Sequence, residues 1–364
     1  YNWLEKNDLT TTQWTTLHPQ SPFYLFIPQD NDLRAEYKEG WKVTDIFPIN
    51  SVGIVTGQDS KTIAITEDDT KTLANSHRIN QQCVKPILYR PFDNRFIVYD
   101  AQVVTRPRRE VMQHMLAGKN LGLITCRQQS QPGEWSLSGV TNSIIESCAV
   151  SNKTKEINSL FPLYVYPETA IEEGMGMKKH PNFSPEFLSK LESLLGYTPA
   201  PENIFYYIYA IFYSPTYRDR YAEFLKIDFP RIPLTSNDEL FHQLADYGEQ
   251  LVQLHLMKSP KLDSLITEFV EGTGEHTVAK GHPKYQDGAV QINKNGDKFT
   301  GVPEEVWNFY VGGYQPCQKW LKDRKGRVLS SEDIAHYQGI VSVLGETIEV
   351  MQAIDSAIPG FPIQ

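Results

Sequence analysis

The sequence has few cysteines, and none of them is arranged as a metal ligand would be. Cys83, Cys126, Cys148 and Cys317 are scattered through 364 residues, without a CxxC pair or a metal-ligand spacing to the nine histidines. This pattern argues against a zinc site and favours a reduced compartment, the cytoplasm. The sequence also has no apolar run of about 18 residues and no signal-peptide pattern, so it predicts no membrane span.

The chain lacks the excess of positive charge that is typical of a uniformly basic nucleic-acid-binding protein. It has 35 Lys and Arg against 44 Asp and Glu, a formal net charge of -9, which argues against that class of protein. The charge is uneven, however. Between Lys85 and Arg127 the sequence has eight basic and three acidic residues, and between Lys319 and Arg327 it has five basic and one acidic. These two segments are therefore where a negatively charged partner is expected to bind.

Motifs of common enzyme classes are missing too. The sequence contains no GxGxxG, Walker loop, HExxH or GxSxG. Acidic pairs such as Asp68 with Asp69 have no partner at a useful spacing and are interpreted as solvated surface. The sequence therefore names no catalytic residue, and two alternatives stay open: an enzyme whose site forms only in three dimensions, or a protein-interaction module.

The most informative stretch is 203–233. From Ile204 to Tyr213 apolar and aromatic residues fall on every side of the helical period, which predicts a helix that is buried all round and belongs to the core rather than to a base-stacking platform. Ser214 and Pro215 predict the start of a second, amphipathic helix. That helix is expected to turn its basic residues away from the apolar stripe, namely Arg218, Arg220 and Lys226.

The other segments predict an α+β fold, with a mixed-sheet recognition lobe over residues 81–180 and a helical lobe over residues 181–260. Residues 261–364 are expected to form short strands and a C-terminal helix. The expected elements are strand-like runs at Phe23 and Ser51, a hairpin at 86–100 turning at Asp93 and Asn94, a strand from Leu121 to Arg127, further strands of the same sheet within 135–151 and 160–166, a hairpin at Asn295 and Gly296, and helices that begin at Ser184 and at the capping boxes Ser236 with Glu239 and Ser330 with Asp333.

Five segments occur in one order along most of the chain. They read FDNRFIVYD, RPRREVMQHMLAGKNLGLITCRQ, FPLYVYP, ENIFYYIYAIFYSPTYRDRYAEFLKIDFPRIP and GYQPCQKWLKDRKGRVLSSEDIAHYQGIV. Together they resemble the C-terminal target recognition region of single-chain restriction-modification enzymes of the Type ISP and related fused kinds. Those enzymes join an N6-adenine DNA methyltransferase, and often a nuclease, to a domain that recognises the target.

This resemblance implies that the chain binds double-stranded DNA sequence-specifically and that residues 1–80 connect it to a preceding methyltransferase domain. The methyltransferase's glycine-rich cofactor loop and its Asn-Pro-Pro-aromatic tetrapeptide are missing here. S-adenosylmethionine, and magnesium for any nuclease, are thus expected in the parent enzyme and not in this chain. Because the first residue is Tyr1 rather than methionine, we expect an adenine methyltransferase domain to be encoded immediately before it.

Ten residues are candidates for DNA contacts: Arg106, Arg108, Arg109, Arg127, Gln128, Lys319, Lys322, Arg324, Lys325 and Arg327. Arginine forks suit phosphates and guanine, and a glutamine such as Gln128 or Gln129 on a loop can make a bidentate contact with adenine. Asp323 and Gly326 suggest a turn that exposes its lysines. The plainer alternatives are a surface cluster paired with Glu110, a polar loop and a solvated turn. If one duplex contacts both basic segments, folding has to bring them to one surface.

Overall fold

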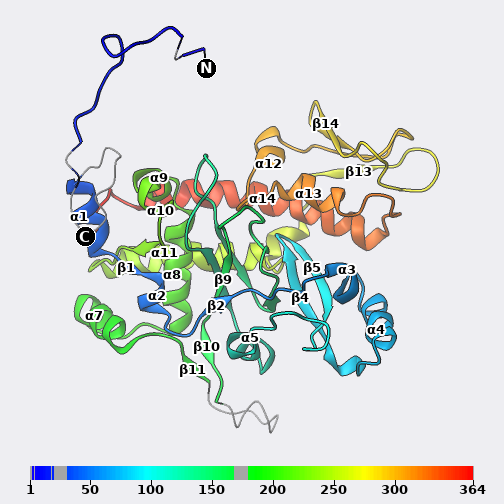
Figure 1. The fold of residues 1–364 in the computed structure, drawn as a ribbon, viewed down its shortest axis with the longest axis horizontal. Helices are drawn as coiled ribbons and strands as arrows, with labels where there is room; N and C mark the ends of the chain where they lie inside the picture. The colour runs from blue at the N-terminus through cyan, green and yellow to red at the C-terminus, as the bar shows by residue number, and fades with distance from the viewer. Residues whose placement is uncertain (1, 4, 18, 20–30, 168–178, 364) are drawn as a thin grey trace.

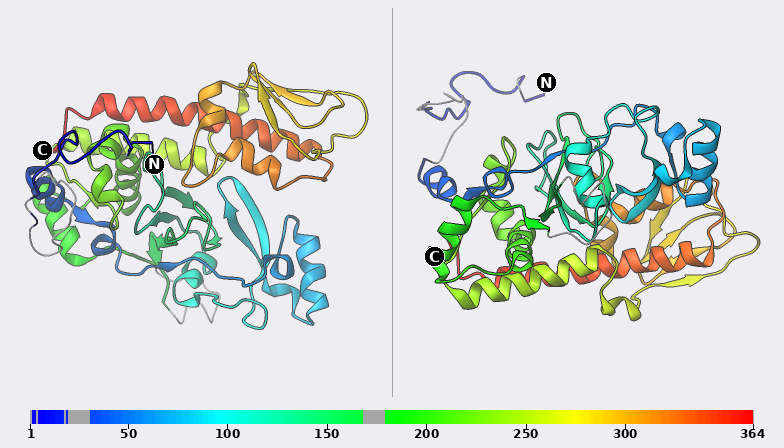
Figure 2. Two further views of the ribbon diagram at one scale, coloured as in Figure 1. Left: turned by 45° about the horizontal axis from the view of Figure 1, so that its top comes forward. Right: turned by 90° about the horizontal axis from the view of Figure 1, so that it is seen from below.

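The structure is a computed structural model that describes residues 2–3, 5–17, 19, 31–167 and 179–363. The predicted α+β class is confirmed: several small sheets lie beside a group of long helices, and α14 (Ser331–Ala357) runs along one side of the molecule (Figures 1 and 2). The strand expected at Phe23 lies outside the described residues. None of the described helices is both long and apolar enough to cross a membrane.

Helix α8 (Pro201–Tyr213) lies at the centre of the helical part. Every residue from Ile204 to Tyr213 is buried, as the all-round apolar pattern predicts. The helix packs on α11 (Asp238–His255) and on α14. At Gly248 of α11 the two backbones come so close that a Cβ atom would lie 1.9 Å from the carbonyl oxygen of Tyr206. Gly248 is thus required by the distance between the helices.

The second helix of the central stretch differs from its prediction. It begins at Pro215 with Ser214 as its cap, as expected, but it breaks at Tyr221 into α9 (Pro215–Arg220) and α10 (Ala222–Leu225). The expectation that Arg218 turns outward is wrong, because its side chain is only 3% exposed. Its Nε donates a hydrogen bond of 2.6 Å to the carbonyl oxygen of Phe212, one of the carbonyls left free in the last turn of α8.

The expected single mixed sheet is also wrong, because the strands expected in it are divided between two four-stranded sheets and a small pair formed by Tyr164–Val165 with His180–Pro181. One has the order β3-β5-β4-β8 and is mixed, since β4 and β8 are parallel; the other, β2-β9-β6-β7, is antiparallel. Their strands are β2 (Ser51–Val52), β3 (Ile63–Ala64), β4 (Val84–Arg90), β5 (Asp93–Val98), β6 (Gly122–Cys126), β7 (Ser138–Thr141), β8 (Ile144–Ile145) and β9 (Asn158–Pro162). The predicted hairpin is β4–β5, but Phe92 with its φ of 60° makes the turn, and Asp93 and Asn94 begin β5.

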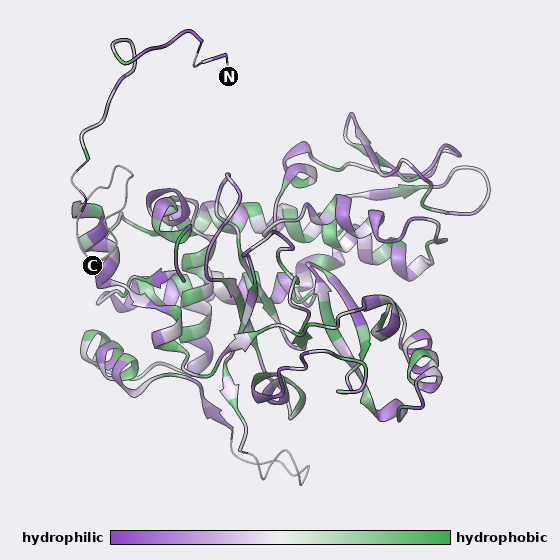
Figure 3. Cartoon of the chain, in the orientation of Figure 1, coloured by the Kyte–Doolittle hydropathy of each residue, from purple (hydrophilic) through white to green (hydrophobic). Residues whose placement is uncertain are grey.

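The remaining elements surround these two groups. They are α1 (Asn31–Glu39), β1 (Trp41–Lys42), α2 (Val43–Ile46), α3 (Asp59–Thr62), α4 (Glu67–Ser76), η1 (Gln81–Cys83), α5 (Arg109–Leu116), β10 (Tyr164–Val165), β11 (His180–Pro181), α7 (Pro185–Leu195), β12 (Arg231–Ile232), η2 (Pro260–Asp263), β13 (Glu268–Val270), β14 (Lys284–Gln286), β15 (Ala289–Gln291), β16 (Lys298–Thr300), α12 (Glu304–Asn308) and α13 (Pro316–Lys322). Apolar residues concentrate on the central strands and the inner helices (Figure 3). The hydrophobic core is continuous between them, from Tyr37 to Ile363.

Two of the other three predicted helix starts are confirmed as well. Ser184 caps α7, and Ser330 with Asp333 forms a capping box at α14. The third is wrong by one residue: Asn237, not Ser236, caps α11 through the backbone N–H of Leu240. Asparagine and serine are about equally good caps, so the sequence alone does not separate these neighbours.

Candidate nucleic-acid interface

The first basic segment lies at the start of α5. Arg106 is tied to Val55 by two backbone hydrogen bonds of 2.9 and 3.1 Å, while its side chain and that of Arg109 are exposed. Arg108 is the residue before α5 and has a left-handed backbone, with φ 53° and ψ 44°. Because the first turn of a helix presents free backbone N–H groups, this end of α5 adds to the positive potential of the arginines.

The second basic segment is only partly available to DNA. Lys322 and Lys325 are exposed, and Lys322 donates a hydrogen bond of 2.6 Å to the Gln318 side chain. Lys319 forms an ion pair with Asp323, and the Arg327 Nε lies 3.7 Å from Asp333. This segment therefore presents two exposed lysines that have no acidic partner among the described residues, while Lys319 and Arg327 are already engaged with acids.

The expectation that Arg324 is presented to DNA is corrected by its burial. Its side chain is 5% exposed, and one of its terminal nitrogens lies 3.0 Å from the Asp93 carboxylate. Its guanidinium also lies over the ring of Trp320, at 3.4 Å from the centroid. Burial by itself raises the pKa of Asp93, but the charges of Arg324 and Arg95 outweigh it and hold that pKa below its usual value. Arg324 therefore has a structural role. If its guanidinium moved out to contact DNA, the buried Asp93 carboxylate would lose one of its ion-pair partners, which is energetically costly.

The two basic segments lie at opposite ends of the β4–β5 hairpin. At the turn end, Arg324 binds Asp93, and Arg95 lies 3.4 Å from Asp323. At the other end, Tyr99 follows β5 and donates a hydrogen bond of 2.7 Å to the carbonyl oxygen of Pro107. The hairpin strand β4 has 7 residues, so the segments are roughly 20 Å apart at about 3.3 Å per residue.

Arg127 and Gln128 follow β6, as the sequence predicts. Arg127 is exposed, although its Nε lies 3.4 Å from Asp228. Together with Asn50 and Lys155 they line a hollow of about 540 Å³. Gln129, the other glutamine considered as an adenine reader, is engaged within its own loop, because its side-chain N–H donates a hydrogen bond of 3.2 Å to the carbonyl oxygen of Gly133.

A comparison with models of known protein families shows the family of this chain. Residues 29–353 match the family described as the Type ISP C-terminal specificity domain. The chain belongs to this family. The resemblance seen in the sequence is thereby confirmed. A comparison with curated proteins found no match.

Solved structures show the same fold as this specificity domain. A nuclease-deletion mutant of the Type ISP restriction-modification enzyme LlaGI, in complex with a DNA substrate mimic, has a TM-score of 0.70 and 16% identity, covering 98% of this chain and 31% of that one. The ATP-dependent Type ISP restriction-modification enzyme LlaBIII bound to DNA has a TM-score of 0.70 and 17% identity, and the match covers 90% of this chain and 24% of that one. A DrdV–DNA complex has a TM-score of 0.73 and 16% identity, and the match covers 97% of this chain and 41% of that one. The specificity domain thus spans well under half the length of each of these three chains.

A further group of basic residues on the specificity domain was not predicted from the sequence. Lys119, Lys179 and Lys258 surround a hollow of about 600 Å³ that is also lined by Asn120 and Asn142. The three lysines are 60 or more positions apart in the sequence, and only the fold brings them together. In the part of the chain that the structure describes, no three His, Cys, Asp or Glu side chains are grouped so that they could hold a metal ion.

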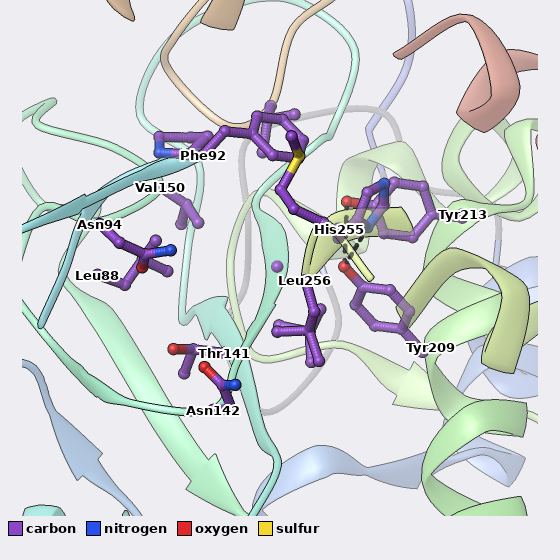
Figure 4. A pocket seen from close by; sticks show the side chains of 15 residues that line it. Leu88, Phe92, Asn94, Thr141, Asn142, Val150, Tyr209, Tyr213, His255 and Leu256 are labelled. Carbon is purple, nitrogen blue, oxygen red and sulfur yellow. Dashed lines mark hydrogen bonds between the residues drawn. The ribbon is translucent and has the colours of Figure 1, made fainter. Parts of the chain in front are cut away.

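A small cavity of about 50 Å³ separates the β4–β5 hairpin from the central helices (Figure 4). His255 lines it, with hydrogen bonds of 2.7 Å to the Tyr209 hydroxyl and 3.0 Å to the Thr347 hydroxyl. Burial, with a smaller contribution from the charge of Arg218, lowers the pKa of His255 from 6.5 to about 3. Because neutral His255 joins α8, α11 and α14, the cavity supports the packing of the specificity domain rather than a binding function.

We expect this histidine to make the specificity domain sensitive to acid. The folded-state pKa is below the unfolded one, so the stabilisation is complete above pH 6.5 and is lost as the pH falls from 6.5 towards 3, with a limiting slope of about 1.4 kcal/mol per pH unit. His255→Gln, whose amide does not titrate in this range, should flatten the pH dependence of the unfolding free energy between about pH 6.5 and 5, where most carboxylates stay ionised. An unchanged slope in urea titrations would contradict this role.

Proposed function

We propose that this chain recognises a specific sequence in duplex DNA on behalf of a restriction-modification enzyme. The observation that carries the proposal is the match to the Type ISP C-terminal specificity domain over residues 29–353. The three structural neighbours are themselves described as complexes with DNA or a DNA mimic. The exposed basic side chains at the two ends of the β4–β5 hairpin add support, since they suit phosphate contacts despite the negative net charge.

The proposed division of labour separates affinity from specificity. Arg106, Arg108, Arg109, Lys322 and Lys325 bind the phosphate backbone and set the position of the duplex, with Lys319 and Arg327 contributing if they leave their acidic partners. Arg127 and Gln128 read base edges, because they lie at the end of a rigid strand and combine a guanidinium fork with an amide. The two basic segments are roughly 20 Å apart along the hairpin, so one duplex lying along the hairpin reaches both with its phosphates.

The parent polypeptide in this proposal is an adenine-specific DNA methyltransferase, with or without a nuclease, acting in the cytoplasm. Its methyltransferase domain precedes this chain and binds S-adenosylmethionine, and any nuclease uses magnesium. The free state of all four cysteines agrees with a reducing compartment. We expect the reading frame upstream of Tyr1 to encode that methyltransferase domain. A frame that begins near Tyr1, or that encodes an unrelated domain, would contradict the proposed parent.

Base reading is tested by separating discrimination from affinity in the parent enzyme. A selection from random duplexes defines the preferred sequence, and binding is then measured for that duplex and for single-base variants at one stated salt concentration. We expect Gln128→Ala or Arg127→Ala to relax the preference at one position by about 1–3 kcal/mol while other positions keep theirs. Gln286→Ala, which truncates an exposed glutamine of β14, is the matched control. Equal discrimination by all these proteins would remove the two residues from the reading site.

A further inference from the structure

The segment 127–137 between β6 and β7 is held by one buried carboxylate. Glu156 is 3% exposed. Its Oε1 accepts hydrogen bonds from the backbone N–H of Ser130 at 2.6 Å, the Ser130 hydroxyl at 3.0 Å and the backbone N–H of Gln131 at 3.2 Å. Its Oε2 accepts a further bond of 2.5 Å from the Ser151 hydroxyl. Among the described residues, the hydrogen-bond partners of the Glu156 carboxylate are thus hydroxyls and amides of the surrounding loops rather than cations.

Burying the Glu156 carboxylate lowers the stability of the folded protein unless each of its hydrogen bonds is formed. A buried carboxylate loses its hydration, and only several well-placed donors compensate for that loss. The loop that supplies three of the four donors is therefore strongly favoured in one conformation. An uncharged acceptor in place of the Glu156 carboxylate would hold the loop less firmly, because hydrogen bonds to a charged acceptor are stronger.

Glu156 itself is fixed to the antiparallel sheet. Asn158, the first residue of β9, donates from its side-chain amide to the Glu156 carbonyl oxygen at 2.8 Å and to the Ser151 carbonyl oxygen at 3.2 Å. Asn158 also pairs with Cys126, the last residue of β6. The loop that leaves β6 is consequently anchored to the strand beside β6, so its position follows that of the sheet.

The anchored loop presents two glutamines on different sides. Gln128 lines the hollow with Arg127 and Lys155 described above. Gln131 is exposed and lines a second hollow of about 720 Å³, together with Asn308 and Tyr310. Gln129, between them, also lines the second hollow, but its side-chain N–H is bound to the carbonyl oxygen of Gly133, and its backbone N–H donates to the carbonyl oxygen of Lys226 at 3.2 Å. The loop thus uses the side-chain N–H of one glutamine for its own structure, while half-buried Gln128 and exposed Gln131 line the two hollows.

We infer that Glu156 is a positioning residue that fixes the loop so that Gln128 and Gln131 meet DNA bases in a set geometry, and that Gln131 is a second base-reading residue. The inference rests on the proposed function. A bidentate amide contact requires both of its hydrogen bonds to be aligned, and a loop that is already ordered loses less conformational entropy on binding. Removing Glu156 should therefore reduce discrimination between sequences more than it reduces non-specific affinity.

The test combines amide hydrogen exchange with DNA binding in the parent enzyme. In Glu156→Ala we expect exchange at the Ser130 and Gln131 amides to become faster by tenfold or more, and the affinity ratio between preferred and altered duplexes to fall by tenfold or more. The salt dependence of non-specific binding should not change, because no phosphate contact is removed. Glu156→Gln keeps one acceptor oxygen and most of the side-chain volume, so its increase in amide exchange and its loss of discrimination should both be smaller. This variant replaces the alanine variant in the test if the latter does not fold. Gln131→Ala should relax the preference at a position distinct from that of Gln128→Ala.

Asp297→Ala is the matched control, because Asp297 is also a fully buried acid that holds a loop, accepting a hydrogen bond of 2.6 Å from the backbone N–H of Gly272. It should lower stability but leave sequence discrimination intact. Unchanged exchange at Ser130 and Gln131 in the Glu156 variants would overturn the anchoring role. Faster exchange with undiminished discrimination would overturn the link to base reading. If the unaltered enzyme shows no sequence preference for duplex DNA, the proposed function fails and the reading roles fall with it, while the exchange result still decides whether Glu156 holds the loop.

Discussion

Gly248→Ala is expected to destabilise the protein by about 3 kcal/mol, although alanine is the better helix former. The gain in helix propensity is at most about 1 kcal/mol. Against it, the new Cβ would lie 1.9 Å from the carbonyl oxygen of Tyr206, and a backbone atom inside α8 cannot move aside as a side chain can. The helices α8 and α11 would have to separate, and their buried aromatic contacts, such as the stacked rings of Tyr207 and Phe241, would be lost.

The matched control for this change is Gly345→Ala in α14. There the nearest atom to the new Cβ is a terminal methyl carbon of Ile266 at 3.1 Å, which a small rotation can move. We expect this variant to be as stable as the unaltered protein or more stable by up to about 1 kcal/mol. Urea unfolding of both variants measures the difference. Equal stability of the two alanine variants would mean that the α8–α11 contact has room to adjust.

Neutralising the exposed cations at the two ends of the β4–β5 hairpin should weaken DNA binding without changing which sequence is preferred. The variants are Arg106→Gln with Arg109→Gln at one end and Lys322→Gln with Lys325→Gln at the other. Each lost phosphate contact should reduce the slope of log affinity against log salt by about one unit. Affinity should fall for all sequences alike, because backbone contacts carry no sequence information.

The comparison of the two pairs also tests the placement of the duplex. If one duplex reaches both ends of the hairpin, the two reductions in slope should add in the fourfold variant, since the sites are too far apart to interact directly. Lys190→Gln with Lys294→Gln, two exposed lysines on α7 and beyond β15, is the matched control. A pair whose removal leaves the slope unchanged lies off the DNA. Arg324 is excluded from this experiment because it is buried, and its replacement would leave the buried Asp93 with only one of its two arginine partners, Arg95.

Local patterns in the sequence were sufficient for elements that depend on a single face or a single cap. The all-round apolar run from Ile204 to Tyr213 predicts a buried helix because no orientation of such a helix exposes a polar side. Ser330 with Asp333 predicts the start of α14 because both capping partners are three residues apart. The family resemblance was likewise visible in the order of five segments, and it is the reason for interpreting the basic residues, which the local charge identifies, as DNA contacts.

Only the tertiary structure decided which polar residues are available to a partner. Arg218 and Arg324 occur in segments whose sequence indicates exposure, yet both side chains are buried. Arg218 is hydrogen-bonded to the carbonyl oxygen of Phe212 in α8, and Arg324 is ion-paired with Asp93. Asp93 and Arg324 are 231 positions apart, and Glu156 holds a loop 25 positions earlier in the chain. The period of a helix or strand says which side chains share a face, but it does not say what packs against that face. The sequence therefore determined the central helices and the family, while the packing of distant segments determined which cations face solvent, which are ion-paired inside, and how the loop with Gln128 and Gln131 is held.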